Sequence, residues 1–94
     1  MVHFLYILFS PSKNTHYIGE TYNLNERLAK HNNHQYTGSF TKIANDWELV
    51  LHLKCHSKDD AIYLEKFIKR MKSKKFILKI IDNPNILTDI LNKK

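Results

Sequence analysis

The sequence contains few of the residues that define several large classes of protein. Its 94 residues include only two glycines and two prolines, which excludes collagen-like, elastic and linker-like chains. The single cysteine, Cys55, excludes an internal disulfide framework, so packing must hold the fold, and a reducing compartment is expected. The apolar run Val2–Phe9 is eight residues long, far below the roughly 20 residues of a membrane span, and it lacks the features of a signal peptide. We therefore expect a cytoplasmic protein without a membrane segment.

Acidic residues are also scarce relative to basic ones. Fifteen lysines and arginines face nine aspartates and glutamates, which gives a net charge of +6 and a pI of about 9.5. This balance favours a polyanionic partner, with nucleic acid as the leading candidate, although a basic surface also serves solubility alone. Hydrophobic residues make up 43% of the chain, enough for one modest core, and the length predicts a single domain over residues 1–94.

Turn residues and hydrophobic patterns divide the chain into short elements. The apolar stretch His3–Phe9 predicts a strand covered on both faces, and Thr15–Gly19 predicts a second strand joined to it as a hairpin. In Trp47–Leu53 every second residue is apolar, which predicts a half-buried strand with those side chains on one face. Residues 33–45 are polar and lack periodicity, so they predict a loop.

Side-chain caps indicate where helices begin. Asn23 and Glu26 have the spacing of a capping box, and Ser57 and Ser73 are expected to cap two later helices. Four helices are predicted, over about residues 23–32, 57–71, 73–81 and 85–92. The predicted class is α/β in the broad sense and α+β in strict terms, with a small three-stranded antiparallel sheet flanked by helices, and with a core over about residues 3–81.

Two polar side chains fall on the apolar stripe of the first predicted helix. Leu24, Arg27, Leu28 and His31 are spaced so that they share one face. Because the leucines must point to the core, Arg27 and His31 are expected beside them at its edge. Two interpretations remain open. The first is an arginine that extends past the core together with an ordinary surface histidine. The second is a cationic pair that faces a pocket suited to a phosphate.

A carboxylate lies at the border of the apolar arc of the second predicted helix. That arc consists of Ala61, Leu64, Ile68 and Met71. Glu65 lies beside it, and one interpretation is a plain i,i+4 ion pair with Lys69 on a solvated face. The other is a lone carboxylate that faces the same pocket as the cationic pair and holds a divalent cation such as Mg²⁺.

The predicted hairpin supplies two tyrosines, Tyr6 and Tyr17. If the strands pair so that these two oppose each other, their side chains share a face, whereas a slip of one residue separates them. Aromatic residues in strands are also ordinary core residues, so this interpretation stays open beside the functional one.

Other familiar chemical motifs are missing. The six histidines invite a zinc site, but neither His31-Asn32-Asn33-His34 nor Cys55-His56 has the spacing of one. There is no glycine-rich phosphate loop and no glycine-flanked serine nucleophile. Cys55 follows an apolar strand, which indicates a strand-end residue rather than a nucleophile.

The order of the remaining candidate residues is recognisable. Tyr6 is followed eleven residues later by Tyr17-Ile18-Gly19, then by Arg27 and His31 on one helix, and by Glu65 on a later one. This order resembles the GIY-YIG nuclease superfamily, and within it small stand-alone proteins related to the N-terminal endonuclease domain of the bacterial excision-repair subunit UvrC. The resemblance covers about residues 3–81. It departs from the family pattern at the first motif, which is Phe4-Leu5-Tyr6 instead of Gly-Ile-Tyr.

The resemblance implies a metal-dependent endonuclease that hydrolyses DNA phosphodiester bonds, in DNA repair or processing. It implies that Glu65 holds Mg²⁺ or Mn²⁺ and that Arg27 stabilises charge on the phosphate. Tyr6 would orient or deprotonate the attacking water, and Tyr17 would bond the phosphate or support Tyr6. His31 would assist proton transfer or bind phosphate. Glu20 is the nearest rival to the metal-binding carboxylate, because it directly follows Tyr17-Ile18-Gly19.

Further implications concern the DNA and the alternatives. Basic residues expected to follow the DNA backbone, unless they form only a solvated face, are Lys69, Arg70, Lys72, Lys74 and Lys75. No small-molecule cofactor is expected, and the asparagine found after the glutamate helix in larger family members has only Asn83 and Asn85 as candidates. The alternative function is a non-catalytic, basic nucleic-acid-binding module on the same fold, and a structural adaptor is a third possibility. The intact set of tyrosines, arginine and glutamate favours the enzyme.

Overall fold

A computed structural model describes residues 2–32 and 43–94. Its elements follow the predicted order: β1 (His3–Ser10), β2 (Thr15–Thr21), α1 (Leu24–Asn32), β3 (Glu48–Cys55), α2 (Lys58–Met71), α3 (Lys74–Asp82) and α4 (Asn85–Asn92). The predicted α+β class is confirmed, and β2 and β3 both extend further than expected. Most of the loop predicted over residues 33–45 lies outside the described residues. No helix within the described ranges combines the length and the apolar character needed to cross a membrane.

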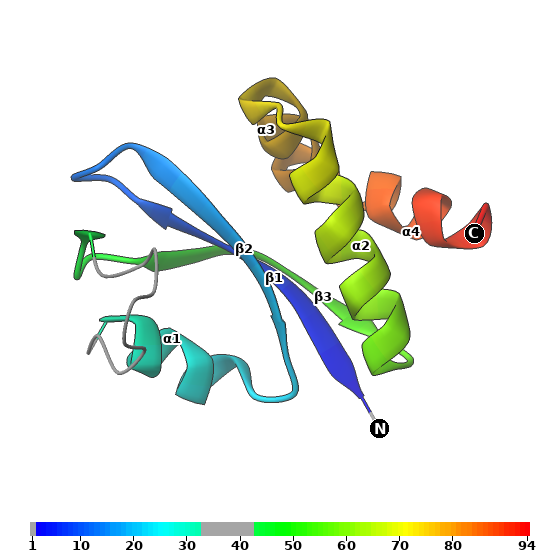
Figure 1. The fold of residues 1–94 in the computed structure, drawn as a ribbon, viewed down its shortest axis with the longest axis horizontal. Coiled ribbons are helices and arrows are strands. Elements are labelled where there is room, and N and C mark those ends of the chain that lie inside the picture. Colours follow the sequence, from blue (N-terminus) through cyan, green and yellow to red (C-terminus); the bar gives the residue numbers. More distant parts are fainter. Residues whose placement is uncertain (1, 33–42) are drawn as a thin grey trace.

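The three strands form one antiparallel sheet in the order β2-β1-β3. One side of the sheet is covered by α1 and the other by α2, α3 and α4 (Figure 1). The central strand β1 is therefore buried on both faces, which is why its sequence is a continuous apolar run. The larger core cluster lies on the α2 side, and a smaller one that includes Tyr6, Leu8 and Trp47 lies on the α1 side.

The hairpin register places the two tyrosines on one face without pairing them directly. Tyr6 pairs with Gly19, and Tyr17 pairs with Leu8, so the two tyrosines are offset by two residues instead of directly opposed. The turn sets this offset: Asn14 adopts a left-handed conformation with φ of 49°, and the ladder closes beyond it. Because side chains alternate with a period of two, the offset still leaves both tyrosines on one face.

A bulge in β3 divides its predicted apolar face. The pairing of β1 with β3 shifts by one residue between Ile7 and Leu8, which leaves Val50 as the extra residue. As a result Leu51 packs on the α2 side of the sheet and Trp47 on the α1 side. The prediction that the alternating apolar residues of this strand share one face was therefore wrong.

The helix caps form largely as predicted. The N-cap serines of α2 and α3 each accept a hydrogen bond at 3.1 Å from the backbone N–H three residues later. The side chain of Asn23 likewise accepts from Glu26 N–H at 3.0 Å. The second half of the capping box is absent, because Glu26 pairs with Lys30 and the Asn23 N–H donates to the Thr21 hydroxyl.

Two core predictions on the α2 side have different outcomes. Met71, predicted as part of the apolar arc of α2, is 47% exposed, because α2 ends there and Lys72 turns the chain with φ of 48°. The other three arc residues are buried. Cys55 is buried at the end of β3, as expected of a strand-end residue.

Candidate active site

Tyr6 and Gly19 lie opposite each other on β1 and β2, on the α1 side of the sheet. A Cβ atom at Gly19 would lie 2.5 Å from Tyr6 Oη and 2.6 Å from its Cζ. The phenol ring therefore occupies the space that any other residue would need for its side chain. Close approach, not backbone torsion, is the reason for glycine here.

Helix α1 brings His31 to the Tyr6 hydroxyl. Tyr6 Oη lies 2.9 Å from His31 Nε2, and the two residues are 1% and 2% exposed. The interpretation of His31 as a surface residue was wrong, since the register of α1 turns it inward. Burial, and secondarily the positive charge of Arg27, lowers the pKa of His31 to about 4. The imidazole is therefore neutral at pH 7, and a neutral ring can accept the Tyr6 hydroxyl proton in a hydrogen bond at Nε2.

Tyr17 completes an aromatic cluster on this face. Its ring centroid lies 4.8 Å from that of His31, 6.3 Å from that of Tyr6 and 6.5 Å from that of Trp47. The two tyrosines are diagonal neighbours across the strand pair, within the reach of aromatic side chains. Three residues of the predicted site therefore meet at the β2 edge of the sheet.

Arg27 lies one helical turn before His31 and is half-buried. Its charge acts on His31 strongly enough to contribute to the lowered pKa of the imidazole. Arg27 also lines a cavity of about 30 Å³ between the end of β2 and the start of α1, which has room for ordered water but not for a nucleotide. The charge of Arg27 is therefore close to His31, and its side chain lies at the edge of the core.

Glu65 approaches the same sheet edge from α2, on the other side of the sheet. Its side chain is 21% exposed, and its Oε2 accepts a hydrogen bond from Lys69 Nζ at 2.8 Å. The same Lys69 Nζ lies 5.7 Å from the centroid of the Tyr17 ring. The ion pair considered from the sequence is thus present, and through Lys69 it connects the carboxylate to the aromatic cluster.

The sequence as a whole matches a family model. The model of the GIY-YIG catalytic domain matches residues 2–77. The chain belongs to the GIY-YIG family. A solved structure with the same fold is the solution NMR structure of the UPF0213 protein BH0048 from Bacillus halodurans, with 24% identity, coverage of 94% of each chain and a TM-score of 0.56. No match is found among curated proteins.

Membership of the GIY-YIG family makes this a nuclease-type domain, for which DNA is the implied substrate. The departure of the first motif from the family pattern falls on two strand positions. Leu5 is fully buried on the α2 side, and Phe4 packs edge-on against His52. Both residues are accounted for by packing, while Tyr6 of the GIY-YIG motif is retained.

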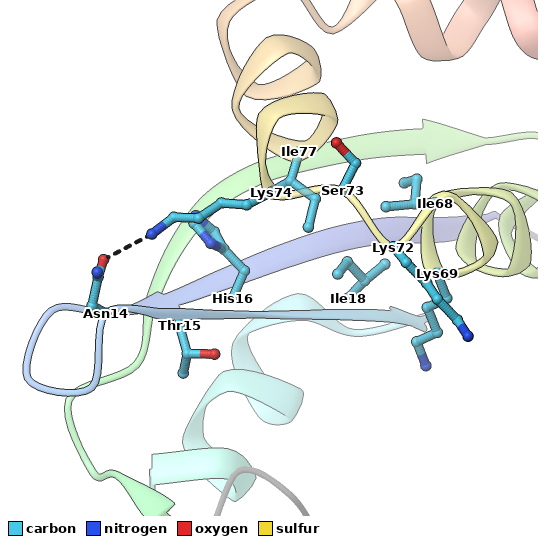
Figure 2. A pocket seen from close by; sticks show the side chains of 10 residues that line it. All are labelled: Asn14, Thr15, His16, Ile18, Ile68, Lys69, Lys72, Ser73, Lys74 and Ile77. Atoms are coloured by element: carbon cyan, nitrogen blue, oxygen red, sulfur yellow. Dashed lines mark hydrogen bonds between the residues drawn. The ribbon is translucent and has the colours of Figure 1, made fainter.

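Three of the five basic residues predicted to bind DNA line one groove. Lys69, Lys72 and Lys74 line a groove of about 330 Å³ between β2 and the turn from α2 to α3 (Figure 2). Arg70 instead lies over the Phe67 ring at 5.8 Å, and Lys75 is exposed but does not line this groove. The sequence alone could not separate them, because their grouping depends on how α2 and α3 sit against β2.

The donor chemistry at Glu65 fits the divalent cation that the GIY-YIG resemblance implies. Among residues 2–32 and 43–94, no three His, Cys, Asp or Glu side chains are grouped closely enough to hold a metal ion. Mg²⁺ commonly takes one or two protein carboxylates and completes its shell with water and phosphate oxygens, so a lone carboxylate suits it. The carboxylate of the rival Glu20 lies against His3 Nε2. Lys69 is the group that a cation at Glu65 would displace.

Asn32, which no sequence pattern singled out for a role, holds the end of α1 in place. Its Nδ2 donates to the Trp47 carbonyl at 3.1 Å, and its Oδ1 accepts from the Trp47 N–H at 2.8 Å. These two bonds fix the position of the neighbouring His31. No local signal could reveal a pair so far apart in the chain. The role of Gly19 was more accessible, since an isolated glycine in a strand indicates close approach of another group.

Asn83 and Asn85 lie apart from this cluster in the sequence and serve helix ends. Asn83 is the C-cap of α3, where its N–H bonds the Lys79 carbonyl at 2.9 Å, and Asn85 begins α4. The structure therefore gives both asparagines a place at a helix end.

Proposed function

We propose that this protein is a metal-dependent endonuclease that hydrolyses phosphodiester bonds in DNA, with a role in DNA repair or processing in the cytoplasm. The observation that supports it best is the buried hydrogen bond between Tyr6 and a neutral His31, beside Tyr17 and Arg27, in a GIY-YIG domain. A purely structural tyrosine does not need a buried imidazole as its partner, because a phenol satisfies its hydroxyl more cheaply at the surface.

Tyr6 is the proposed group that orients the attacking water. A histidine whose pKa is about 4 is a poor final acceptor for a proton at pH 7, since transferring a proton to it costs roughly 4 kcal/mol. His31 is also too buried to bind phosphate. We therefore assign His31 as a positioning residue, which holds the Tyr6 hydroxyl by accepting its proton in a hydrogen bond and leaves the oxygen lone pairs for the water.

Arg27 and Tyr17 are the proposed phosphate contacts. A guanidinium at the core edge can donate two parallel hydrogen bonds to phosphate oxygens and stabilise the charge that develops there. Tyr17 is half-buried beside His31, so its hydroxyl can donate to the same phosphate.

Glu65 is the proposed ligand for Mg²⁺ or Mn²⁺. When bound, the cation neutralises charge on the scissile phosphate. Lys69 bonds the Glu65 carboxylate and so neutralises it in the absence of the cation. On release from Glu65, the Lys69 ammonium remains beside Tyr17 and beside the groove lined by Lys69, Lys72 and Lys74, which we call the lysine groove. There it can contact DNA phosphate.

A second function is favoured by the ion pair itself. A carboxylate that serves only to hold Lys69 would be expected in a non-catalytic DNA-binding module on the same fold. The two functions separate in one assay: cleavage of supercoiled plasmid, a flap duplex and single-stranded DNA, with and without Mg²⁺. We expect Mg²⁺-dependent cleavage of at least one substrate by the wild type, and cleavage slower by about 100-fold or more by Glu65→Gln. Binding of DNA without cleavage of any substrate would support the binding module instead.

A further inference from the structure

The lysine groove begins at Lys69, the residue that joins Glu65 to Tyr17. Lys69 and Lys72 stand at one end of the groove, and Lys74 stands at the other (Figure 2). The floor between them is apolar and consists of Ile18, Ile68 and Ile77. No carboxylate lines this groove, so the charged side chains that line it are all basic. It is therefore a continuation of the candidate active site that suits a phosphate.

A second groove, of about 390 Å³, continues from the first. The two share Asn14, His16 and Lys74, and Lys74 Nζ donates to Asn14 Oδ1 at 3.3 Å on their boundary. The remaining lining of the second groove is apolar and consists of Phe9, Val50, Leu78 and Ile81. Leu78 is 51% exposed, so its side chain is open to a ligand in this groove. A cationic compartment and an apolar compartment thus lie side by side.

The shared residue His16 presents an aromatic face. Its ring stacks on Phe9 with centroids 4.7 Å apart and an interplanar angle of 40°. Burial, and then the charge of Lys74, lowers the pKa of His16 below its ordinary value, so the ring is neutral at pH 7. The boundary between the grooves therefore offers stacking rather than a further positive charge.

We propose that these two grooves together bind an unpaired nucleotide of the strand that flanks the scissile phosphate. The lysines take its phosphate, and the surface formed by Leu78 and the His16–Phe9 pair takes its base. This inference rests on the proposed function, because the phosphate that enters the active site fixes where the flanking strand runs. It makes single-stranded or flapped DNA the preferred substrate over intact duplex.

The choice between unpaired and paired DNA follows from the apolar groove. In a duplex each base is stacked between its neighbours, so a duplex reaches the protein mainly through its phosphates and leaves the apolar groove empty. An unpaired base can leave the stack and lie against apolar and aromatic side chains, which typically contributes about 1–3 kcal/mol per base. The lysines serve both forms of DNA, whereas Leu78 serves only the unpaired one.

The test measures DNA binding by fluorescence anisotropy with excess chelator, so that no cleavage takes place. The probes are an oligothymidylate of about 12 nucleotides, a duplex of the same length, and the same single strand carrying abasic sites. The variant is Leu78→Ser, with Leu78→Met as the conservative replacement. The matched control is Val2→Ser, which removes another exposed apolar side chain, 41% exposed, directly before β1 and at the opposite end of that strand from the hairpin turn.

We expect Leu78→Ser to weaken binding of the oligothymidylate about tenfold and binding of the duplex less than about twofold. Leu78→Met and Val2→Ser should bind both probes like the wild type, and the wild type should bind the abasic strand about tenfold more weakly than the oligothymidylate. Equal losses for single strand and duplex, or no loss for the single strand, would overturn the inference. So would an abasic strand that binds as tightly as the oligothymidylate, a result that does not depend on the folding of any variant.

Failure here is distinguishable from failure of the proposed function. If the protein cleaves DNA with Mg²⁺ but shows no base-dependent binding, the proposed function stands and the proposed subsite is wrong. If the protein prefers the unpaired strand but cleaves no substrate, the subsite stands as part of a non-catalytic binding module.

Discussion

The phenol ring of Tyr6 lies where a side chain of Gly19 would be, with Oη only 2.5 Å from the position of a Cβ atom. The glycine of the Tyr-Ile-Gly motif therefore has a steric role that is specific to the partner strand. It lets the Tyr6 ring lie close against β2 and reach His31 on α1. The two motifs on neighbouring strands are thus parts of one contact.

Gly19→Ala tests this contact directly. The added methyl group cannot fit unless the Tyr6 ring moves, so we expect a loss of about 1–3 kcal/mol in the free energy of unfolding. The ring should also lose its hydrogen bond to His31. Urea denaturation measures the first effect and tyrosine side-chain NMR the second. The adjacent Ile18→Val, which only removes a buried methylene, serves as the control at about 0.5–1.5 kcal/mol. An alanine variant as stable as the wild type would contradict the steric role.

A double-mutant cycle at Tyr6 and His31 measures their coupling. Tyr6→Phe removes the hydroxyl from a buried imidazole, which should cost about 1–3 kcal/mol, and His31→Leu should cost a similar amount. Because both remove the same hydrogen bond, the double variant should be more stable than the sum of the two losses predicts. Tyr6→Phe should also lower the cleavage rate by about 100-fold or more, as expected for a group that handles a proton. Additive losses in stability would show that the two side chains do not interact.

The pKa of His31 predicts how stability depends on pH. The folded value is about 4 and the unfolded reference is 6.5, so the unfolded chain binds more protons between these values. The stability that depends on neutral His31 is fully present above pH 6.5 and is lost progressively as the pH falls toward 4. The expected loss is roughly 2–3 kcal/mol. Denaturation at a series of pH values for wild type and His31→Gln gives the difference, with the exposed His52→Gln as the control. Parallel pH profiles for wild type and His31→Gln would be contrary to a buried neutral imidazole.

Glu65 and Lys69 predict opposite effects on metal binding. Glu65→Gln keeps the volume of the side chain, so the fold should stay stable, while Mn²⁺ binding measured by the EPR signal of free Mn²⁺ should be lost. Cleavage should fall by about 100-fold or more, which corresponds to roughly 3 kcal/mol of transition-state stabilisation. Lys69→Gln removes the competing ammonium and should tighten Mn²⁺ binding several-fold.

Two controls accompany the metal test. Asp60→Asn breaks another ion pair, that of Asp60 with Lys94 at 2.8 Å, and should leave Mn²⁺ binding unchanged. Glu20→Gln tests the rival carboxylate, and it too should bind Mn²⁺ normally. Loss of Mn²⁺ in Glu20→Gln with normal binding in Glu65→Gln would reverse the assignment.

The lysines of the groove predict a salt dependence of DNA binding. Neutralising Lys72 and Lys74 to glutamine should flatten the slope of log affinity against log salt by about two units, if each contacts one phosphate. Lys75→Gln should leave the slope unchanged, because Lys75 does not line the groove. A change for Lys75→Gln as large as that for Lys72→Gln would mean that the whole basic segment acts as one diffuse surface.

The sequence by itself determined the elements of this protein and the types of residue at its site. Apolar runs, capping serines and a helical stripe are local signals, because they act between residues a few positions apart. They were sufficient to place three strands and four helices in order along the described residues. The resemblance to the GIY-YIG family, and not these local signals, joined Tyr6, Tyr17, Arg27, His31 and Glu65 into one set.

Only the tertiary structure decided how these residues meet. The offset of Tyr6 from Tyr17 depends on how the turn at Asn14 closes, and the split face of β3 depends on one bulged residue, Val50. Lys69 reaches Tyr17 because α2 crosses the sheet near the β2 edge, a relation between elements far apart in the chain. Such features carry no local signal, since they arise from packing several elements against each other, where a shift of a single residue moves a side chain to the other face of the sheet.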